Sequence, residues 1–174
     1  MMRLRKQTGV AAVEFALILV PMLVLCMGIT ELGRALYYYN GLVKATRGAA
    51  RYLTAKDLSS LTSGTAYGSG AANSDVQAAI ALGWCGTTVC ASGATSLVPG
   101  LDASKVSIIT HNDVQATDGT SALGSVHLVT VRIGPDDPAN GNDPRAVWFE
   151  SFLPYSITRF KFSPVTITMA WSVT

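Results

Sequence analysis

Glu14 is the residue whose chemistry most needs an explanation, because it is the one charged side chain in the apolar stretch of residues 10–29. A carboxylate in such a stretch costs about 2–3 kcal/mol on membrane-insertion scales and requires a partner. Gly9 stands five residues earlier, at the end of a leader that carries three cations and no acid. Cleavage after Gly9 would remove these cations and create an α-amine at Val10. That amine can neutralise Glu14 of a neighbouring copy and set the axial stagger between copies.

The N-terminus also allows other interpretations. Glu14 can pair with Arg5 or Lys6 of its own leader by snorkelling. A secretory signal peptide also begins with cations and an apolar run, but here an acid interrupts the run and no small-x-small cleavage site follows it. Lipid modification of Cys26 is excluded, because Leu25 precedes it at the position where a small residue is needed.

Cys85 and Cys90 flank a four-residue turn and are candidates for a disulfide. An oxidising compartment favours that bond, although so short a loop gives an entropic stabilisation of only about 2 kcal/mol. A metal site would need two further ligands, and His111 and His127 are distant in the sequence. Both histidines lie in predicted strands, so we expect them to be structural, and we expect Cys26 to face lipid or a helix.

The sequence shows no catalytic pattern. It lacks a nucleophile elbow, an HExxH motif, a P-loop and a dinucleotide fingerprint. The DDPANGND segment (136–143) is rich in oxygen ligands, but its spacing is not that of an EF-hand, so a polar loop is preferred to a calcium site. Thirteen bases against eleven acids argue against a nucleic-acid binder. We therefore expect no enzymatic activity, cofactor, metal or small-molecule substrate.

A long helix over residues 10–56 must position the N-terminal residues. Its first twenty residues would span about 30 Å, the thickness of a bilayer core, and the cations before it predict a cytoplasmic N-terminus. Pro21 can kink this span. Lys44, Arg47 and Arg51 share one face, which we interpret as solvated; contact with anionic headgroups or with an acidic subunit is the alternative. Beyond the span, the helix continues with a heptad-like seam of Leu32, Leu36, Tyr39, Val43, Thr46, Ala50 and Leu53.

The remaining residues, 57–174, predict a small α+β head in which an antiparallel sheet is covered by the long helix and by short helices. The composition of residues 59–74 predicts a polar linker. A helix is expected over 74–82, capped by Ser74 and Gln77 and stopped by Gly83. A second helix is expected after Asp143-Pro144, ending at Pro154. Strands are expected over residues 105–111, 125–133 and 165–172.

Residues 3–52 resemble the TadE-like family, the pseudopilins or minor pilins of the tight-adherence (Flp-type) pilus. The resemblance rests on GVAAVEF at 9–15, on ELGRA at 31–35 and on the AxRGAARY pattern at 45–52. It implies a type IV prepilin signal, in which Gly9 and Val10 form the processing junction. Glu14 becomes the acid at the fifth mature position, and Phe15 the aromatic residue after it.

The resemblance further implies three parts: a leader (1–9), a transmembrane and amphipathic helix (10–56) and a periplasmic head (57–174). A prepilin peptidase, other pilins and the assembly platform are the implied partners, and the protein would cross the inner membrane once. The alternative is a signal-anchored periplasmic domain that binds a ligand or acts as an enzyme, with the N-terminus as a tether only.

Overall fold

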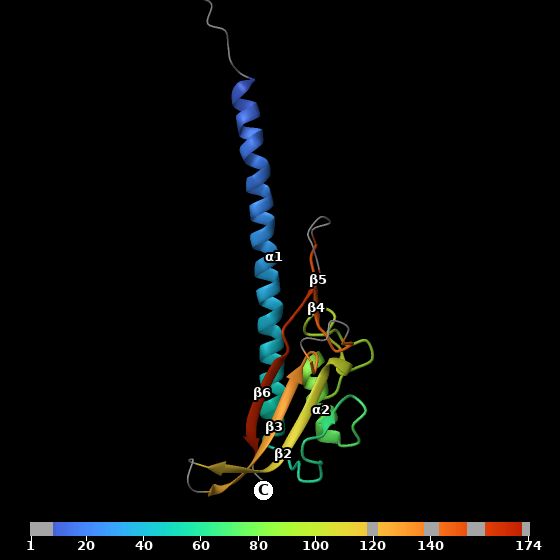
Figure 1. Ribbon diagram of the computed structural model, residues 1–174. Coiled ribbons are helices and arrows are strands. Elements are labelled where there is room, and N and C mark those ends of the chain that lie inside the picture. Colours follow the sequence, from blue (N-terminus) through green and yellow to red (C-terminus); the bar gives the residue numbers. More distant parts are fainter. Residues whose placement is uncertain (1–8, 118–121, 138–142, 153–158, 172–174) are drawn as a thin grey trace, which may run out of the picture. The chain divides into compact units, whose positions relative to one another are not determined.

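The computed structural model describes residues 9–117, 122–137, 143–152 and 159–171 (Figure 1). The chain divides into two compact units, Met1–Tyr37 and Tyr38–Thr174, and the boundary falls inside the first helix. Helices and antiparallel sheets make up the described residues, so the predicted α+β class is confirmed.

Helix α1 (Val10–Leu53) contains 44 residues and passes through Pro21 without ending. In the first unit the side chains of residues 10–30 are all exposed. The helix is long and apolar enough to cross a membrane, which agrees with a single-pass anchor.

The part of α1 in the second unit packs with a wider stripe than the predicted seam. Its buried residues are Leu42, Ala45, Thr46, Ala49, Ala50 and Leu53. Thr46, Ala50 and Leu53 of the seam are buried, whereas Val43 is half-buried and Tyr39 exposed. A helix that packs on a globular core buries a broader face than a coiled-coil seam, so residues on both sides of the seam are covered.

The larger sheet has the order β1-β2-β3-β6 and is antiparallel throughout. It consists of β1 (Ala66–Tyr67), β2 (Val106–Thr117), β3 (Ala122–Ile133) and β6 (Val165–Trp171). The three longer strands were predicted, although β2 continues further than expected. The buried centre is made of Val106 and Ile108 on β2, and Val129 and Val131 on β3.

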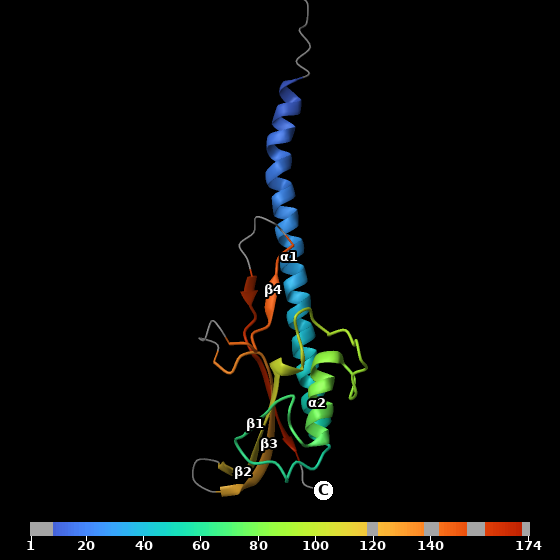
Figure 2. The same cartoon turned by 90° about the vertical axis from the view of Figure 1, so that its right-hand side faces the viewer.

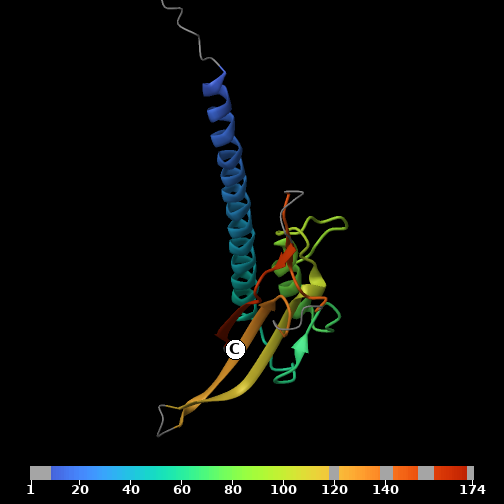
Figure 3. The same ribbon diagram turned by 45° about the horizontal axis from the view of Figure 1, so that its top comes forward.

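The β2–β3 pair extends beyond its neighbours as a two-stranded ribbon (Figure 3). Strand β6 pairs with β3 only from His127 to Ile133, and β1 pairs with β2 only at Ile108 and Ile109. The register shifts between His111 and Val114, as expected for a bulge at the point where the ribbon begins.

Helix α2 (Ser74–Cys85) lies beside the last turns of α1 (Figures 1 and 2). The predicted caps were wrong by one to three residues. Asn73 is the N-cap and accepts hydrogen bonds from the backbone of Asp75 and Val76, and Gly86 ends the helix with φ 81°. Gly83 lies within the helix instead of stopping it. Close packing accounts for a glycine there, because a side chain would meet Val106 at 3.3 Å and Ala49 at 3.9 Å.

The helix predicted after Asp143 is also wrong. Residues Trp148–Glu150 form strand β4, which pairs with β5 (Arg159–Lys161) as a separate two-stranded sheet. Asp143 accepts a hydrogen bond from the Arg145 backbone and so forms a turn instead of a helix cap. Aromatic packing outweighs the local helix signal here: the Phe149 ring lies 5.0 Å from Phe160, between centroids.

The predicted linker 59–74 is bound to the sheet. It contains β1, and the Gly64 amide donates to the Thr110 carbonyl at 2.7 Å. Asn112 reaches the same segment through two hydrogen bonds, from its backbone amide to the Ser63 hydroxyl and from its side chain to the Leu61 carbonyl. The polar composition of residues 59–74 therefore reflects turns at a sheet edge.

Candidate processing junction and membrane anchor

Gly9 and Val10 lie at the point where α1 begins. The first helical residue is Val10, and the Val13 amide donates to the Gly9 carbonyl at 3.3 Å. A methyl group added at Gly9 would meet no atom within 4 Å, and Gly9 is not among the glycines with positive φ. Neither close packing nor backbone conformation therefore requires glycine at this position.

Glu14 is exposed in the second turn of α1. In residues 9–117 and the other described ranges, no side chain forms an ion pair or hydrogen bond with it. The alternative partners Arg5 and Lys6 lie outside the described residues. Phe15 is exposed as well. The described fold of one chain gives neither Glu14 nor Phe15 a contact that would explain its presence.

The apolar span ends in a short polar segment of the helix. The Thr30 hydroxyl donates to the Cys26 carbonyl at 2.9 Å, which satisfies it within the helix. Glu31 and Arg34 form an ion pair at 3.0 Å one turn later. Cys26 itself is a free, exposed thiol on the apolar surface. Glu31 and Arg34 are the first charged residues after the apolar stretch, although Leu32 and Leu36 beside them are still exposed.

Lys44, Arg47 and Arg51 point away from the core and are exposed. Within the part of the chain that the structure describes, none of the three has an ion-pair partner. The arrangement agrees with a solvated face.

A polar cluster that sequence reasoning missed ties the end of α1 to the start of α2. The Lys56 ammonium lies 3.1 Å from the Asp75 carboxylate, and the Tyr52 hydroxyl donates to the same oxygen at 3.2 Å. The hydrogen bonds with Asp75 and Tyr52 raise the pKa of Lys56 above its ordinary value. Twenty-three residues separate Tyr52 from Asp75, so no local pattern signals this contact.

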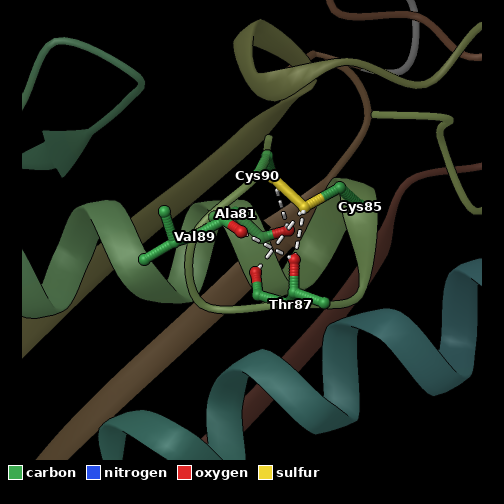
Figure 4. The surroundings of a disulfide bond; sticks show 5 residues. All are labelled: Ala81, Cys85, Thr87, Val89 and Cys90. Atoms are coloured by element: carbon green, nitrogen blue, oxygen red, sulfur yellow. Dashed lines mark hydrogen bonds between the residues drawn. A yellow bond between two sulfur atoms is a disulfide. The ribbon is translucent and has the colours of Figure 1, made fainter. Parts of the chain in front are cut away.

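Cys85 and Cys90 are joined by a disulfide that closes the turn after α2 (Figure 4). Their Cα atoms are 6.2 Å apart. Inside the loop, the Thr87 hydroxyl donates to the Val89 carbonyl at 3.0 Å and lies 3.2 Å from the Cys85 sulfur. The Val89 side chain is exposed at the tip of this loop. The bond fixes a surface turn.

The acid-rich turn is an ion-pair cluster. Asp136 accepts from Arg132 at 3.0 Å and also pairs with Arg145, so both of its carboxylate oxygens face guanidinium groups. Residues 138–142 of the segment lie outside the described residues. Across the described residues, no three His, Cys, Asp or Glu side chains come together as a metal site would require.

The two histidines stand in β2 and β3. The His127 ring packs on Trp171 with centroids 4.9 Å apart, and His111 pairs with Leu128 in the sheet register.

Asp102 caps the short 3₁₀ turn Ala103–Lys105. Partial burial raises the pKa of Asp102, but hydrogen bonds from Ser104 and the charge of Lys105 outweigh it and lower the pKa below its ordinary value.

Comparison with known proteins gives a match to about a quarter of the chain, near its N-terminus. A family model described as TadE-like protein matches residues 9–51. Comparisons with curated proteins and with solved structures give no match. The match begins at Gly9 and covers nearly all of α1, so it includes the junction, Glu14 and the basic face. The resemblance inferred from the sequence is thus confirmed, and the chain is similar to TadE-like proteins over residues 9–51.

Proposed function

We propose that this protein is a membrane-anchored pseudopilin or minor pilin of a tight-adherence (Flp-type) pilus. A prepilin peptidase cleaves it between Gly9 and Val10, and the product takes part in pilus assembly. The N-terminus faces the cytoplasm, the apolar part of α1 crosses the inner membrane once, and residues 57–174 form a periplasmic head.

The observation that carries the proposal is that Gly9 and Glu14 have no role in the described fold. Gly9 adopts an ordinary conformation in open space, and Glu14 places a carboxylate on an apolar helix surface without a described partner. Residues that a fold does not use, at a spacing that the TadE-like match includes, are best explained by an external protein. A peptidase that reads the glycine and a neighbouring subunit that receives the acid account for both.

Cleavage after Gly9 would change the charges at the N-terminal end of the helix. Cleavage removes Arg3, Arg5 and Lys6, whose charges oppose withdrawal of the helix from the bilayer. The new α-amine at Val10 then pairs with Glu14 of an adjacent subunit, which offsets the cost of a carboxylate in apolar surroundings. The helix itself survives cleavage, because its first residue is Val10.

The first residue of the mature protein tests the proposal. Mass spectrometry of protein from membranes is expected to find Val10 at the N-terminus when the peptidase is present. A Gly9→Ala or bulkier Gly9→Val variant is expected to retain the leader, although the space around Gly9 accepts the added methyl group. Protein that keeps residues 1–9 despite an active peptidase would refute the proposal and leave a tethered domain as the explanation.

A further inference from the structure

Strands β4 and β5 with the adjoining Phe152, which we call the β4–β5 hairpin, present aromatic side chains to solvent. Phe152 is 81% exposed and Phe160 is 46% exposed. Their neighbours Phe149 and Phe162 are buried, and the Phe160 ring lies 5.0 Å from Phe149 and 5.5 Å from Phe162, between centroids. The exposed Phe160 ring is therefore carried on a packed aromatic base, and Phe152 adds a second exposed ring after β4, as on a surface that contacts an apolar phase.

The same hairpin carries a local excess of positive charge on an acidic head. Residues 57–174 contain nine acids and five bases, a net charge of 5 − 9 = −4. Strand β5 holds two of those bases, Arg159 and Lys161, against one acid, Glu150, in β4. The Arg159 side chain is 65% exposed; its Nε lies 3.8 Å from a Glu150 carboxylate oxygen, and its guanidinium lies 5.0 Å from the Trp148 ring centroid. With Lys161, which is half-buried, the two strands keep a net charge of +1. Aromatic rings beside a net positive charge match the chemistry of an anionic membrane surface.

Chain length limits how far the second unit can lie from the bilayer, whatever the arrangement of the two units. Tyr38, the first residue of the second unit, contacts Phe149 with ring centroids 5.9 Å apart. Tyr38 stands only nine positions after Ile29, the end of the apolar stretch. Because an extended residue spans at most about 3.6 Å, Tyr38 lies within about 32 Å of the membrane core. The bilayer surface is thus a partner at very high effective concentration.

We propose that the β4–β5 hairpin is a membrane-contacting element that places Phe152 and Phe160 in the headgroup region of an anionic bilayer, with Arg159 and Lys161 against lipid phosphates. This inference rests on the proposed membrane anchoring of α1. The contact would give the head a second attachment and fix which of its faces turns toward lipid.

Depth-dependent fluorescence quenching of the full chain in nanodiscs tests the contact. A bimane label is placed at position 152 in a Phe152→Cys, Cys26→Ser variant, and lipids with a nitroxide near the headgroup act as quenchers. The matched head control is a label at Ser60→Cys, an exposed position of the same unit. We expect several-fold stronger quenching at 152 than at 60 in anionic nanodiscs, and a smaller difference in zwitterionic ones. Equal quenching at both positions would overturn the proposal.

Two further measurements distinguish failure of the hairpin contact from failure of the membrane anchor. A label on native Cys26 reports the anchor itself: strong quenching there with none at 152 refutes the hairpin contact alone, whereas no quenching at either site refutes the anchor and the inference with it. Arg159→Gln with Lys161→Gln is expected to reduce quenching at 152 in anionic nanodiscs only, and unchanged quenching contradicts the headgroup role. A second copy of the chain is the alternative occupant. The unlabelled Phe152→Cys, Cys26→Ser variant tests it, because the cysteines introduced at position 152 of two copies in contact can form a disulfide crosslink. Such a crosslink, together with no lipid quenching of the labelled variant, would assign the surface to a second copy and overturn the lipid proposal.

Discussion

Glu14 and Gly9 are both residues that the described fold tolerates without using, and that property makes their variants informative. Substitutions that disturb a core lower stability and function together. A change at either position leaves the packing of the described residues intact, because Glu14 is exposed and a Cβ added at Gly9 would meet no atom within 4 Å. Loss of function in such a variant therefore reports an interaction with another molecule.

For Glu14 we expect that Glu14→Ala is still trimmed at Gly9 but assembles few or no pili, because the carboxylate that receives the neighbour's amine is missing. Glu14→Gln, which keeps the shape and removes the charge, is expected to be equally defective. The readouts are the mature N-terminus by mass spectrometry and the yield of sheared pili. A normal pilus yield from either variant would contradict the role of this charge.

At the scale of elements, the two ends of α2 show what local sequence patterns can resolve. The helix was predicted in the correct region, but Ser74 was assigned the cap that Asn73 provides. Both residue types cap helices well, and only the backbone decides between them: Asn73 is extended, with φ −75° and ψ 125°. Gln77 binds the Ser69 and Ala71 carbonyls instead of closing a capping box.

The adjacent residues Asn73 and Ser74 offer a matched test of this cap. Asn73→Ala is expected to lower the free energy of unfolding by about 1 kcal/mol, because the Asp75 and Val76 amides lose their acceptor. Ser74→Ala, at the exposed first residue of the helix, is expected to change it by only a few tenths. Denaturant unfolding of the full chain in detergent, monitored by a label on the head, measures both. A larger effect from Ser74→Ala would place the cap where the sequence suggested.

Strands β4 and β5 show where the sequence was insufficient. Asp143-Pro144 followed by apolar residues has the local features of a helix start. The competing information lies in Phe160 and Phe162, which pack on Phe149 from more than ten positions away. Longer strands such as β6 were predictable, because apolar and polar residues alternate along a strand that buries one face.

At the scale of the whole molecule, the sequence was most informative where the chemistry is least ordinary. An acid in an apolar stretch and a glycine after three cations are rare enough to predict a processed membrane helix from one chain. The match over residues 9–51 covers this same part. The head is built from common apolar patterns, so its class was predictable, whereas long-range contacts such as Lys56 with Asp75 were not.

The disulfide also makes the molecule a natural reporter of its own topology. A head exposed to the periplasm meets an oxidising environment, whereas a head retained in the cytoplasm meets reducing thiols. If denatured protein is treated with a thiol-reactive polymer, periplasmic chains are expected to gain one polymer, at Cys26, and to gain three after reduction. A Cys85→Ser control gains two in both cases. Three polymers without reduction would place the head on the cytoplasmic side, so a single gel reports the orientation of an untagged chain.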